Sequence, residues 1–207
     1  MSASEVIGVL DYDAGNLTSV ENALRYLGAK WVLSPDPQAL AGCDRLIFPG
    51  DGHAATSMGN LKARGLDRLL ADFAARGRPI LGICVGSQIV LDHSDEGPTD
   101  CLGLVPGTCH RLPGGPGLKV PHMGWNTVHF EVDHPLVAGV PQDSSFYFVH
   151  SYYTDPEAPA RVLGTTDHGL RFVVGFLKDT LATWQFHPEK SGEAGLRLVK
   201  NFLDWRP

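Results

Sequence analysis

The order of apolar runs and helical periodicities in the first 90 residues restricts the fold more than any other feature of the sequence. Short apolar runs typical of buried strands cover residues 6–10, 31–33, 46–48 and 79–83. Between them, two sets of residues recur at the spacing of one helical face: Val20, Ala23, Leu24 and Leu27, then Leu66, Leu69, Leu70 and Phe73. Alternating strands and helices imply right-handed crossovers and parallel pairing. We therefore predict an α/β fold: an open, mostly parallel sheet with helices on both faces and a ligand crevice at the carboxyl ends of its strands.

The second half of the chain has a different texture. From about residue 101 to residue 183, short β-branched and aromatic runs are interrupted by Pro and Gly, which predicts a smaller antiparallel section. Residues 181–186 are a further strand candidate, and Leu196, Val199, Phe202 and Leu203 line a final helix. No linker rich in Ser, Gly or charge divides the 207 residues, so we expect a single domain over residues 1–207.

Charge and cysteine usage exclude several classes of protein. The formal charge is -6 and no segment concentrates Lys and Arg, so we expect neither a nucleic-acid partner nor a membrane partner. The amino terminus carries acids where a secretory signal is basic, which predicts a cytoplasmic protein. The four cysteines form no C-x-x-C pair, the histidines form no H-E-x-x-H, and Cys101, Cys109 and His110 lack paired spacing. We therefore expect reduced thiols, no metal and no cofactor.

Cys84 is the candidate nucleophile. It lies in GICVGSQ, between the strand at 79–83 and a predicted helix at 85–92, with Gly82 and Gly86 on either side. A tight turn of this kind exposes a nucleophile, and unpaired N–H groups at a helix start favour the reactive thiolate. The alternative is a small apolar side chain at the end of a buried strand, so the pattern needs a partner base.

The candidate base and its orienting acid are His187 and Glu189, in QFHPEKS. Extended chain directs residues two apart to one side, and Pro188 is expected to hold the link extended. Glu189 can then accept a hydrogen bond from one ring nitrogen while the other takes the proton of Cys84. Alternatively, His187 is a satisfied histidine at a strand end and Glu189 a solvated charge.

The segment PGDG, residues 49–52, is a candidate for the oxyanion hole. Its glycines let the backbone run close to a ligand, so an amide of Asp51 or Gly52 can join the N–H of Val85 in stabilising a tetrahedral intermediate. An ordinary Pro-Gly turn is the alternative reading of the same four residues.

These motifs together resemble those of the class I, or triad-type, glutamine amidotransferases, which carry G-x-C-x-G-x-Q and H-P-E. DYDAGNLTSVENAL, PHMGWN, YFVHSYY and GLRLVKNFL are similar to the branch that serves imidazole glycerol phosphate synthase, and these landmarks run from residue 11 to residue 203. The resemblance implies a flavodoxin-like fold. It also implies that Cys84 attacks the side-chain amide of L-glutamine to give a thioester and ammonia, helped by His187 and Glu189.

The resemblance further implies the binding residues and the partner. Gln88 looks like a substrate contact, and the backbone cradle of the substrate is placed at Gly50, Gly52, Ser151 and Tyr152. Ammonia is expected to pass to a cyclase with a (βα)8 barrel in a heterodimer. Three residues are expected at that interface: Asn16, Trp125 and Lys190. Trp125 alone fits a core position equally well, and Lys190 a solvated surface.

Some positions depart from the usual family motifs DYGMGN, PGVGxF and GICLGMQ, where this chain has Asp13, Asp51, His53, Val85 and Ser87. A carboxylate at Asp51 is unfavourable beside a developing oxyanion unless its side chain points into solvent. Two other functions stay open at this point. The chain is a glutaminase of another synthase, or it is a catalytically idle subunit that binds a partner.

Overall fold

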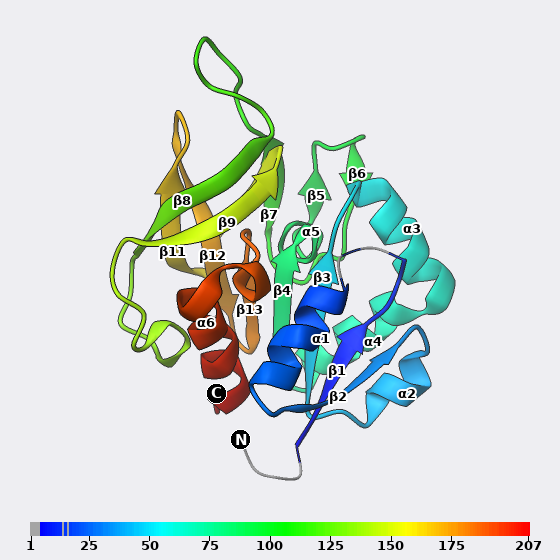
Figure 1. The fold of residues 1–207 in the computed structure, drawn as a ribbon. Helices are drawn as coiled ribbons and strands as arrows, with labels where there is room; N and C mark the ends of the chain where they lie inside the picture. Colours follow the sequence, from blue (N-terminus) through cyan, green and yellow to red (C-terminus); the bar gives the residue numbers. More distant parts are fainter. Residues whose placement is uncertain (1–4, 14, 16) are drawn as a thin grey trace.

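A mixed sheet of 13 strands runs through the computed structural model, which describes residues 5–13, 15 and 17–207 (Figure 1). Its parallel part has the spatial order β2 (Lys30–Ser34), β1 (Val6–Leu10), β3 (Arg45–Gly50), β4 (Ile80–Cys84) and β13 (Leu181–Trp184). The pairs β1–β2, β1–β3, β3–β4 and β4–β13 are all parallel. The predicted α/β fold with a parallel sheet is therefore confirmed.

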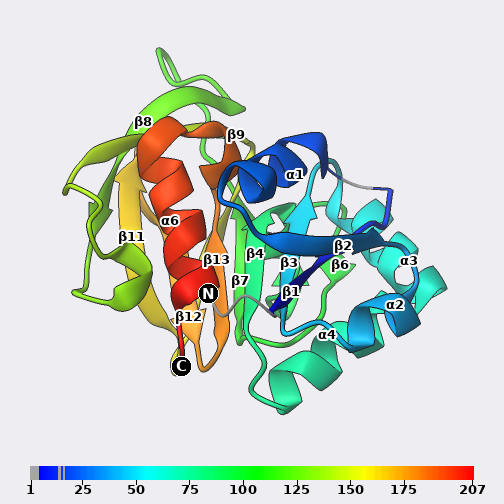
Figure 2. The same ribbon diagram turned by 60° about the horizontal axis from the view of Figure 1, so that its bottom comes forward.

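Helices cover both faces of this parallel part. Helices α1 (Leu17–Tyr26) and α6 (Gly192–Asp204) lie on one face, and α2 (Pro37–Ala41), α3 (Ala54–Arg64) and α4 (Leu66–Ala75) lie on the other (Figures 1 and 2). The apolar faces predicted for α1 and α4 are buried. Sequence patterns missed α3, because it is polar and contains Gly59; a side-chain cap from His53 marks its start instead. No helix of the described residues is both long and apolar enough to cross a membrane.

Mostly antiparallel strands continue the sheet beyond β13, as predicted for the second half of the chain, although β5 and β7 pair in parallel. The order runs through β12 (Arg171–Lys178), β10 (Tyr152–Pro156), β7 (Gly107–Arg111), β5 (His93–Ser94) and β6 (Thr99–Asp100). From β12 a branch leads through β11 (Arg161–Asp167) to β8 (His122–Phe130) and β9 (Ser144–His150), which lie across the upper left in Figure 1. Short helical turns are α5 (Val85–Gln88), η1 (Pro135–Val137) and η2 (Pro188–Lys190).

An aromatic cluster fixes β9 against the end of β13. The ring centroids of Phe146 and Phe186 are 4.3 Å apart, and those of Trp184 and Phe186 are 5.2 Å apart. Phe148 packs edge-on against Phe186 at 5.5 Å. All four rings are buried, and each such side chain contributes about 1.5–3 kcal/mol to folding. Because Phe186 immediately precedes His187, this cluster also sets where the candidate base lies.

Candidate active site

Cys84 occupies a sharp turn between β4 and α5, as the sequence predicted. Its backbone has φ 55° and ψ -113°, a conformation that residues with a side chain rarely adopt, and the residue is 2% exposed. A Cβ at Gly86 would lie 2.0 Å from the Phe48 carbonyl oxygen, and one at Gly82 would lie 2.8 Å from the Gly86 carbonyl oxygen. Both glycines are therefore required for the turn to pack.

Helix α5 is shorter than predicted, since it ends at Gln88 and not at residue 92. The carbonyls of Ile89, Val90 and Leu91 accept hydrogen bonds from the N–H groups of residues 102–105. These carbonyls are satisfied by a neighbouring loop, which replaces further helical turns. The dipole of a helix of four residues is small, so the helix itself provides less support for a thiolate than the sequence suggested.

His187 and Glu189 make the predicted contact. The ring Nδ1 of His187 lies 2.8 Å from Oε1 of Glu189, and both side chains are 3% exposed. The link between them is not extended, because Pro188 begins the 3-10 turn η2. The fixed φ of Pro188 suits this turn, which brings Glu189 back to the ring. The peptide N–H of His187 donates to the Tyr147 carbonyl on β9, at 3.0 Å.

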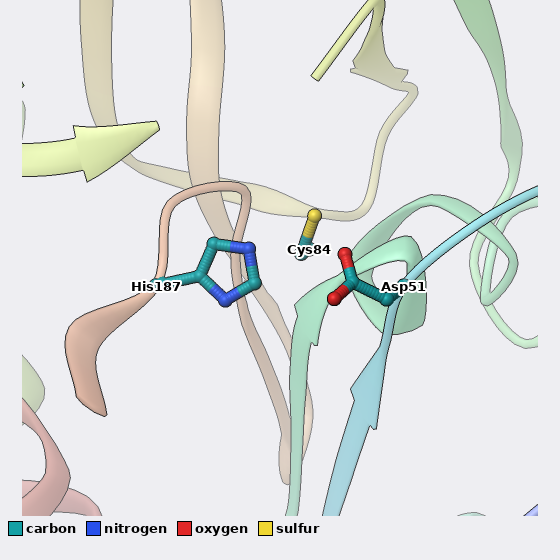
Figure 3. Close-up of side chains that lie close together, drawn as sticks. All are labelled: Asp51, Cys84 and His187. Atoms are coloured by element: carbon teal, nitrogen blue, oxygen red, sulfur yellow. The ribbon is translucent and has the colours of Figure 1, made fainter. Parts of the chain in front are cut away.

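The other ring nitrogen of His187 points toward the sulfur of Cys84 (Figure 3). This Nε2 is buried and has no hydrogen-bond partner among the described residues, and the ring lies within 4.8 Å of the Cys84 sulfur. Burial by itself lowers the pKa of His187, but the interactions with Cys84 and Glu189 outweigh it and raise the pKa to about 10. An imidazole that Glu189 orients and supports in this way is suited to taking the proton of a thiol.

Asp51 is the third group at the sulfur. β3 and β4 pair in register, with Gly50 opposite Cys84, so the residue after β3 lies beside the turn. The Asp51 carboxylate points toward Cys84 and His187, and the three groups lie within 4.8 Å of one another (Figure 3). A carboxylate and a thiolate at that distance repel by about 3–4 kcal/mol at an effective dielectric constant of about 20. The carboxylate is therefore directed at the sulfur, but the residue is partly exposed, so water weakens this repulsion.

Three other departures from the family motifs have local explanations. Asp13 has φ 59°, where glycine is usual, and its carboxylate pairs with Arg64. The His53 ring accepts a hydrogen bond from the Ala55 N–H at 3.2 Å and so caps α3. The Ser87 hydroxyl donates to the Cys84 carbonyl at 2.6 Å and so supports the turn. Asp13, His53 and Ser87 therefore have local structural roles, and none of them belongs to the group formed by Cys84, His187 and Asp51.

A cavity of about 230 Å³ opens onto the sulfur. The predicted residues that line it, besides Cys84, are Asp51, Gly52, Val85, Gln88, Ser151 and Tyr152. Gly50 lies behind its wall, where a Cβ would meet the Tyr12 hydroxyl at 2.4 Å. Glu96, which the sequence analysis missed, also lines the cavity, and its carboxylate accepts the Ala54 N–H at 2.7 Å. A larger hollow of about 480 Å³ between Phe130 and Gln142 has no thiol or imidazole in its lining.

Two buried amides surround the nucleophile. Nε2 of Gln185 lies 4.0 Å from the Cys84 sulfur, and its Oε1 accepts from Nε2 of Gln88 at 3.1 Å. The same Gln88 nitrogen also donates to the Tyr152 carbonyl, at 3.0 Å. Gln88 is therefore held by protein groups on its nitrogen, one helical turn from Cys84, where the family motif places a substrate contact.

A buried histidine pair extends this network to β8. Nδ1 of His150 donates to the Tyr152 carbonyl at 2.8 Å, so its Nε2 accepts from Nδ1 of His122 at 2.9 Å. Nε2 of His122 accepts in turn from Asn126 at 3.2 Å. Burial lowers the pKa of His122 to about 4 and that of His150 to about 3. Both rings are therefore neutral at pH 7. Each group in the chain donates a hydrogen bond to the next, from Asn126 through His122 and His150 to the Tyr152 carbonyl.

The residues expected at a partner interface differ in how the structure places them. Trp125 on β8 is 61% exposed, with Met123 two residues before it at 63%. The Trp125 ring lies 6.2 Å from Tyr147 on β9. Lys190 is half-buried in η2, and Asn16 lies outside the described residues. Two large exposed apolar side chains on one face of a strand are typical of a contact surface.

Comparisons with known proteins agree with this geometry. The family profile described as "Glutamine amidotransferase class-I" matches residues 8–205. Imidazole glycerol phosphate synthase subunit HisH of Dehalococcoides mccartyi is 44% identical over 96% of this chain and 96% of its own. The subunit of the same name from Neisseria meningitidis serogroup A is 46% identical over 95% of this chain and 98% of its own.

Solved structures show the same fold at lower identity. A structure described as a glutamine amidotransferase has a TM-score of 0.76 at 20% identity, over 96% of this chain and 97% of its own. PurLQS from Thermotoga maritima has a TM-score of 0.73 at 19% identity, over 97% of this chain and 98% of its own. The family profile matches almost the whole chain, and the relatives align with it over nearly their full length. The chain therefore belongs to the class-I glutamine amidotransferases and, within them, to the HisH subunits of imidazole glycerol phosphate synthase.

Proposed function

We propose that the chain, as a single glutaminase domain in the cytoplasm, hydrolyses L-glutamine to glutamate and ammonia through a thioester on Cys84. One observation carries this proposal. The sulfur of Cys84 faces an imidazole whose far nitrogen is held 2.8 Å from the buried carboxylate of Glu189, at the wall of a cavity of about 230 Å³. A thiol, a base and an orienting acid in this order are what acyl transfer to sulfur requires.

The proton movements follow from this geometry. Nε2 of His187 takes the thiol proton, and the sulfur attacks the side-chain amide carbon of glutamine. The imidazolium then gives the proton to the amide nitrogen, the C–N bond breaks and ammonia leaves. Water adds to the thioester with His187 again as the base, and glutamate leaves as the thiol regains its proton. The N–H of Val85 and an amide of Asp51 or Gly52 stabilise the negative oxygen of both tetrahedral intermediates.

The cavity residues account for selection of the substrate. We assign Glu96 to the α-ammonium group of glutamine, because it contributes a carboxylate to the cavity lining away from the Cys84, His187 and Asp51 group. Gln88 and the backbone of Gly52, Ser151 and Tyr152 form the rest of the proposed cradle, and Gly50 supports it from behind the cavity wall. The other thiols are unsuited to attack, since burial raises the pKa of Cys43 and Cys109, and that of Cys101 to about 11.

The relatives are named as subunits of a synthase, which implies a partner subunit. We propose that this partner is a cyclase with a (βα)8 barrel, which forms a heterodimer with the chain and receives its ammonia. There the ammonia reacts with a phosphoribulosyl aminoimidazole carboxamide nucleotide in histidine biosynthesis. The exposed Met123 and Trp125 on β8 support a partner surface on this side, and Asn16 and Lys190 are assigned to the same interface.

The test is glutamate production by the isolated chain and by the chain mixed with the cyclase and its nucleotide. We expect slow hydrolysis alone and a rise with the loaded cyclase. Cys84→Ser should abolish turnover, and should also abolish a glutamyl adduct on the peptide that carries Cys84. The matched control is Cys101→Ser, which changes a thiol outside the cavity and should retain activity.

Three results would contradict the proposal. Turnover by folded Cys84→Ser would exclude Cys84 as the nucleophile. Hydrolysis that does not respond to this cyclase, but does respond to a different synthase, would assign the chain to another pathway. No hydrolysis in any mixture, with partner binding intact, would identify an idle binding subunit.

A further inference from the structure

The described residues bring three potential metal ligands of different chemistry together at the cavity. A sulfur from Cys84, a ring nitrogen from His187 and a carboxylate oxygen from Asp51 all lie within 4.8 Å of one another (Figure 3). They come from the ends of β4, β13 and β3, which are far apart in the sequence. The sequence lacks a metal-binding motif of closely spaced ligands, but this site does not need one. The fold brings its three ligands together from distant parts of the chain.

We propose that Cys84, His187 and Asp51 form a reversible binding site for Zn²⁺ or a similar borderline divalent cation, which shuts off the nucleophile and the base together. The combination of thiolate, imidazole and carboxylate suits Zn²⁺ and disfavours Mg²⁺ and Ca²⁺, which prefer oxygen ligands alone. Three protein ligands leave a fourth tetrahedral position, which the cavity keeps accessible to water.

The imidazole is prepared for this role. Nε2 of His187 is buried, faces the sulfur and has no hydrogen-bond partner among the described residues. Its Nδ1 lies 2.8 Å from Glu189. Metal-bound histidines usually donate their second ring nitrogen to a carboxylate in this way, which fixes the ring and strengthens the ligand. Glu189 would therefore hold His187 for a cation by the same contact that orients it as a base.

Asp51 completes the ligand set. Within the described part of the chain, its carboxylate has no hydrogen bond or ion pair that occupies it. Tetrahedral zinc with ordinary bond lengths places its ligand atoms about 3.3–3.6 Å apart, so the three groups must approach by about 1 Å. The Asp51 side chain follows β3 at the start of a loop, which allows that movement. A thiolate and a carboxylate would balance the two charges of the cation, with neutral His187.

The site goes beyond the proposed function, and its binding test does not depend on glutamine turnover. Co²⁺ is the probe, because a thiolate ligand gives it a charge-transfer absorption band; Zn²⁺ then competes for the site. We expect one Co²⁺ per chain, displacement by Zn²⁺ and no displacement by the same concentration of Mg²⁺. Cys84→Ser should abolish the band. Asp51→Asn should weaken binding by about tenfold or more, whereas the control Asp179→Asn, in an exposed turn, should bind as the wild type does.

A second measurement uses the wild-type chain and needs no variant. Zn²⁺ should slow alkylation of Cys84 by iodoacetamide, with the modified peptide identified by mass spectrometry, and a chelator should restore the rate. The proposal is overturned if Asp51→Asn binds Co²⁺ as tightly as the wild type, or if Zn²⁺ leaves the alkylation of Cys84 unchanged. Loss of glutaminase activity in every sample, with metal binding intact, would count against the proposed function alone.

Discussion

The backbone conformation of Cys84 leads to a prediction about stability that is independent of its chemistry. At φ 55° and ψ -113°, a residue with a Cβ is strained, and such strain costs about 1–3 kcal/mol. Glycine adopts this region freely. We therefore compare Cys84→Gly with Cys84→Ala, because both lack the sulfur and differ only in the methyl group that causes the strain.

The expected difference follows from two opposing terms. Removing the Cβ recovers about 1–3 kcal/mol of strain, and the greater freedom of glycine in the unfolded chain costs about 0.5–1 kcal/mol. The net gain for Cys84→Gly over Cys84→Ala is therefore about 0.5–2 kcal/mol. In a chain of 207 residues this corresponds to a melting temperature about 1–8 °C higher.

Scanning calorimetry of the two variants measures this difference. Ala71→Gly in the exposed middle of α4 is the reference, because there the same change should lower stability by about 1 kcal/mol. Both variants at position 84 should lack glutaminase activity. A melting temperature of Cys84→Gly equal to or below that of Cys84→Ala would refute the idea that the turn stores backbone strain for the nucleophile.

Three further predictions concern charged groups. The folded-state pKa of His187, about 10, lies above the 6.5 of a free imidazole, so its proton stabilises the fold fully below pH 6.5 and this contribution is lost as the pH rises through 10. The melting temperature of the wild type should therefore exceed that of His187→Gln by less and less as the pH rises from 6.5 to 10. A constant difference between the two melting temperatures would contradict the raised pKa. The effect of pH on stability is opposite for His122 and His150. Their folded-state pKa values, about 4 and about 3, lie below 6.5, so the fold loses stability as the pH falls. His122→Phe leaves Nε2 of His150 without its hydrogen-bond donor, so it should lower the free energy of unfolding by about 1–3 kcal/mol at pH 7. The decrease should be smaller near pH 4. Thermal unfolding at both pH values measures the difference. Glu96→Gln should raise the KM for glutamine by about tenfold or more with a smaller change in kcat, because it removes the charged partner that we propose for the α-ammonium group. The control is Asp95→Asn, at a residue outside the cavity lining. Equal KM values for the two variants would exclude the role of Glu96.

The parallel sheet and the proposed catalytic trio could be predicted from local pattern. Apolar runs alternate with helical periodicities. Cys84 is the last residue of β4 and His187 comes shortly after β13, and this topology fixes where both strands end. The glycines around Cys84 also predicted the tight turn correctly, because close contacts within and beside the turn leave no room for a side chain there. Where short-range sterics decide the structure, the sequence is sufficient.

Other features depend on contacts that local patterns do not record. The direction of the Asp51 side chain depends on groups delivered by two other strands. His122 and His150 meet because β8 and β9 pair in register, although 28 residues separate them. Glu96 reaches the cavity from the short connection between β5 and β6, which carries no motif. In each case the residue has an ordinary local context, and only the tertiary arrangement makes it part of the site.

Strand β9 holds both reacting groups through its main chain. The Tyr147 carbonyl accepts the N–H of His187, and the Val149 carbonyl lies 3.9 Å from the sulfur of Cys84. Residues two apart on a strand direct their carbonyls to one side, so this strand acts as a spacer that sets how far the sulfur is from the imidazole. The outer side of the same strand carries Tyr147 next to Trp125. A protein that pressed on Trp125 and bent β9 would thus tune the reactivity of the thiol without touching either reacting side chain.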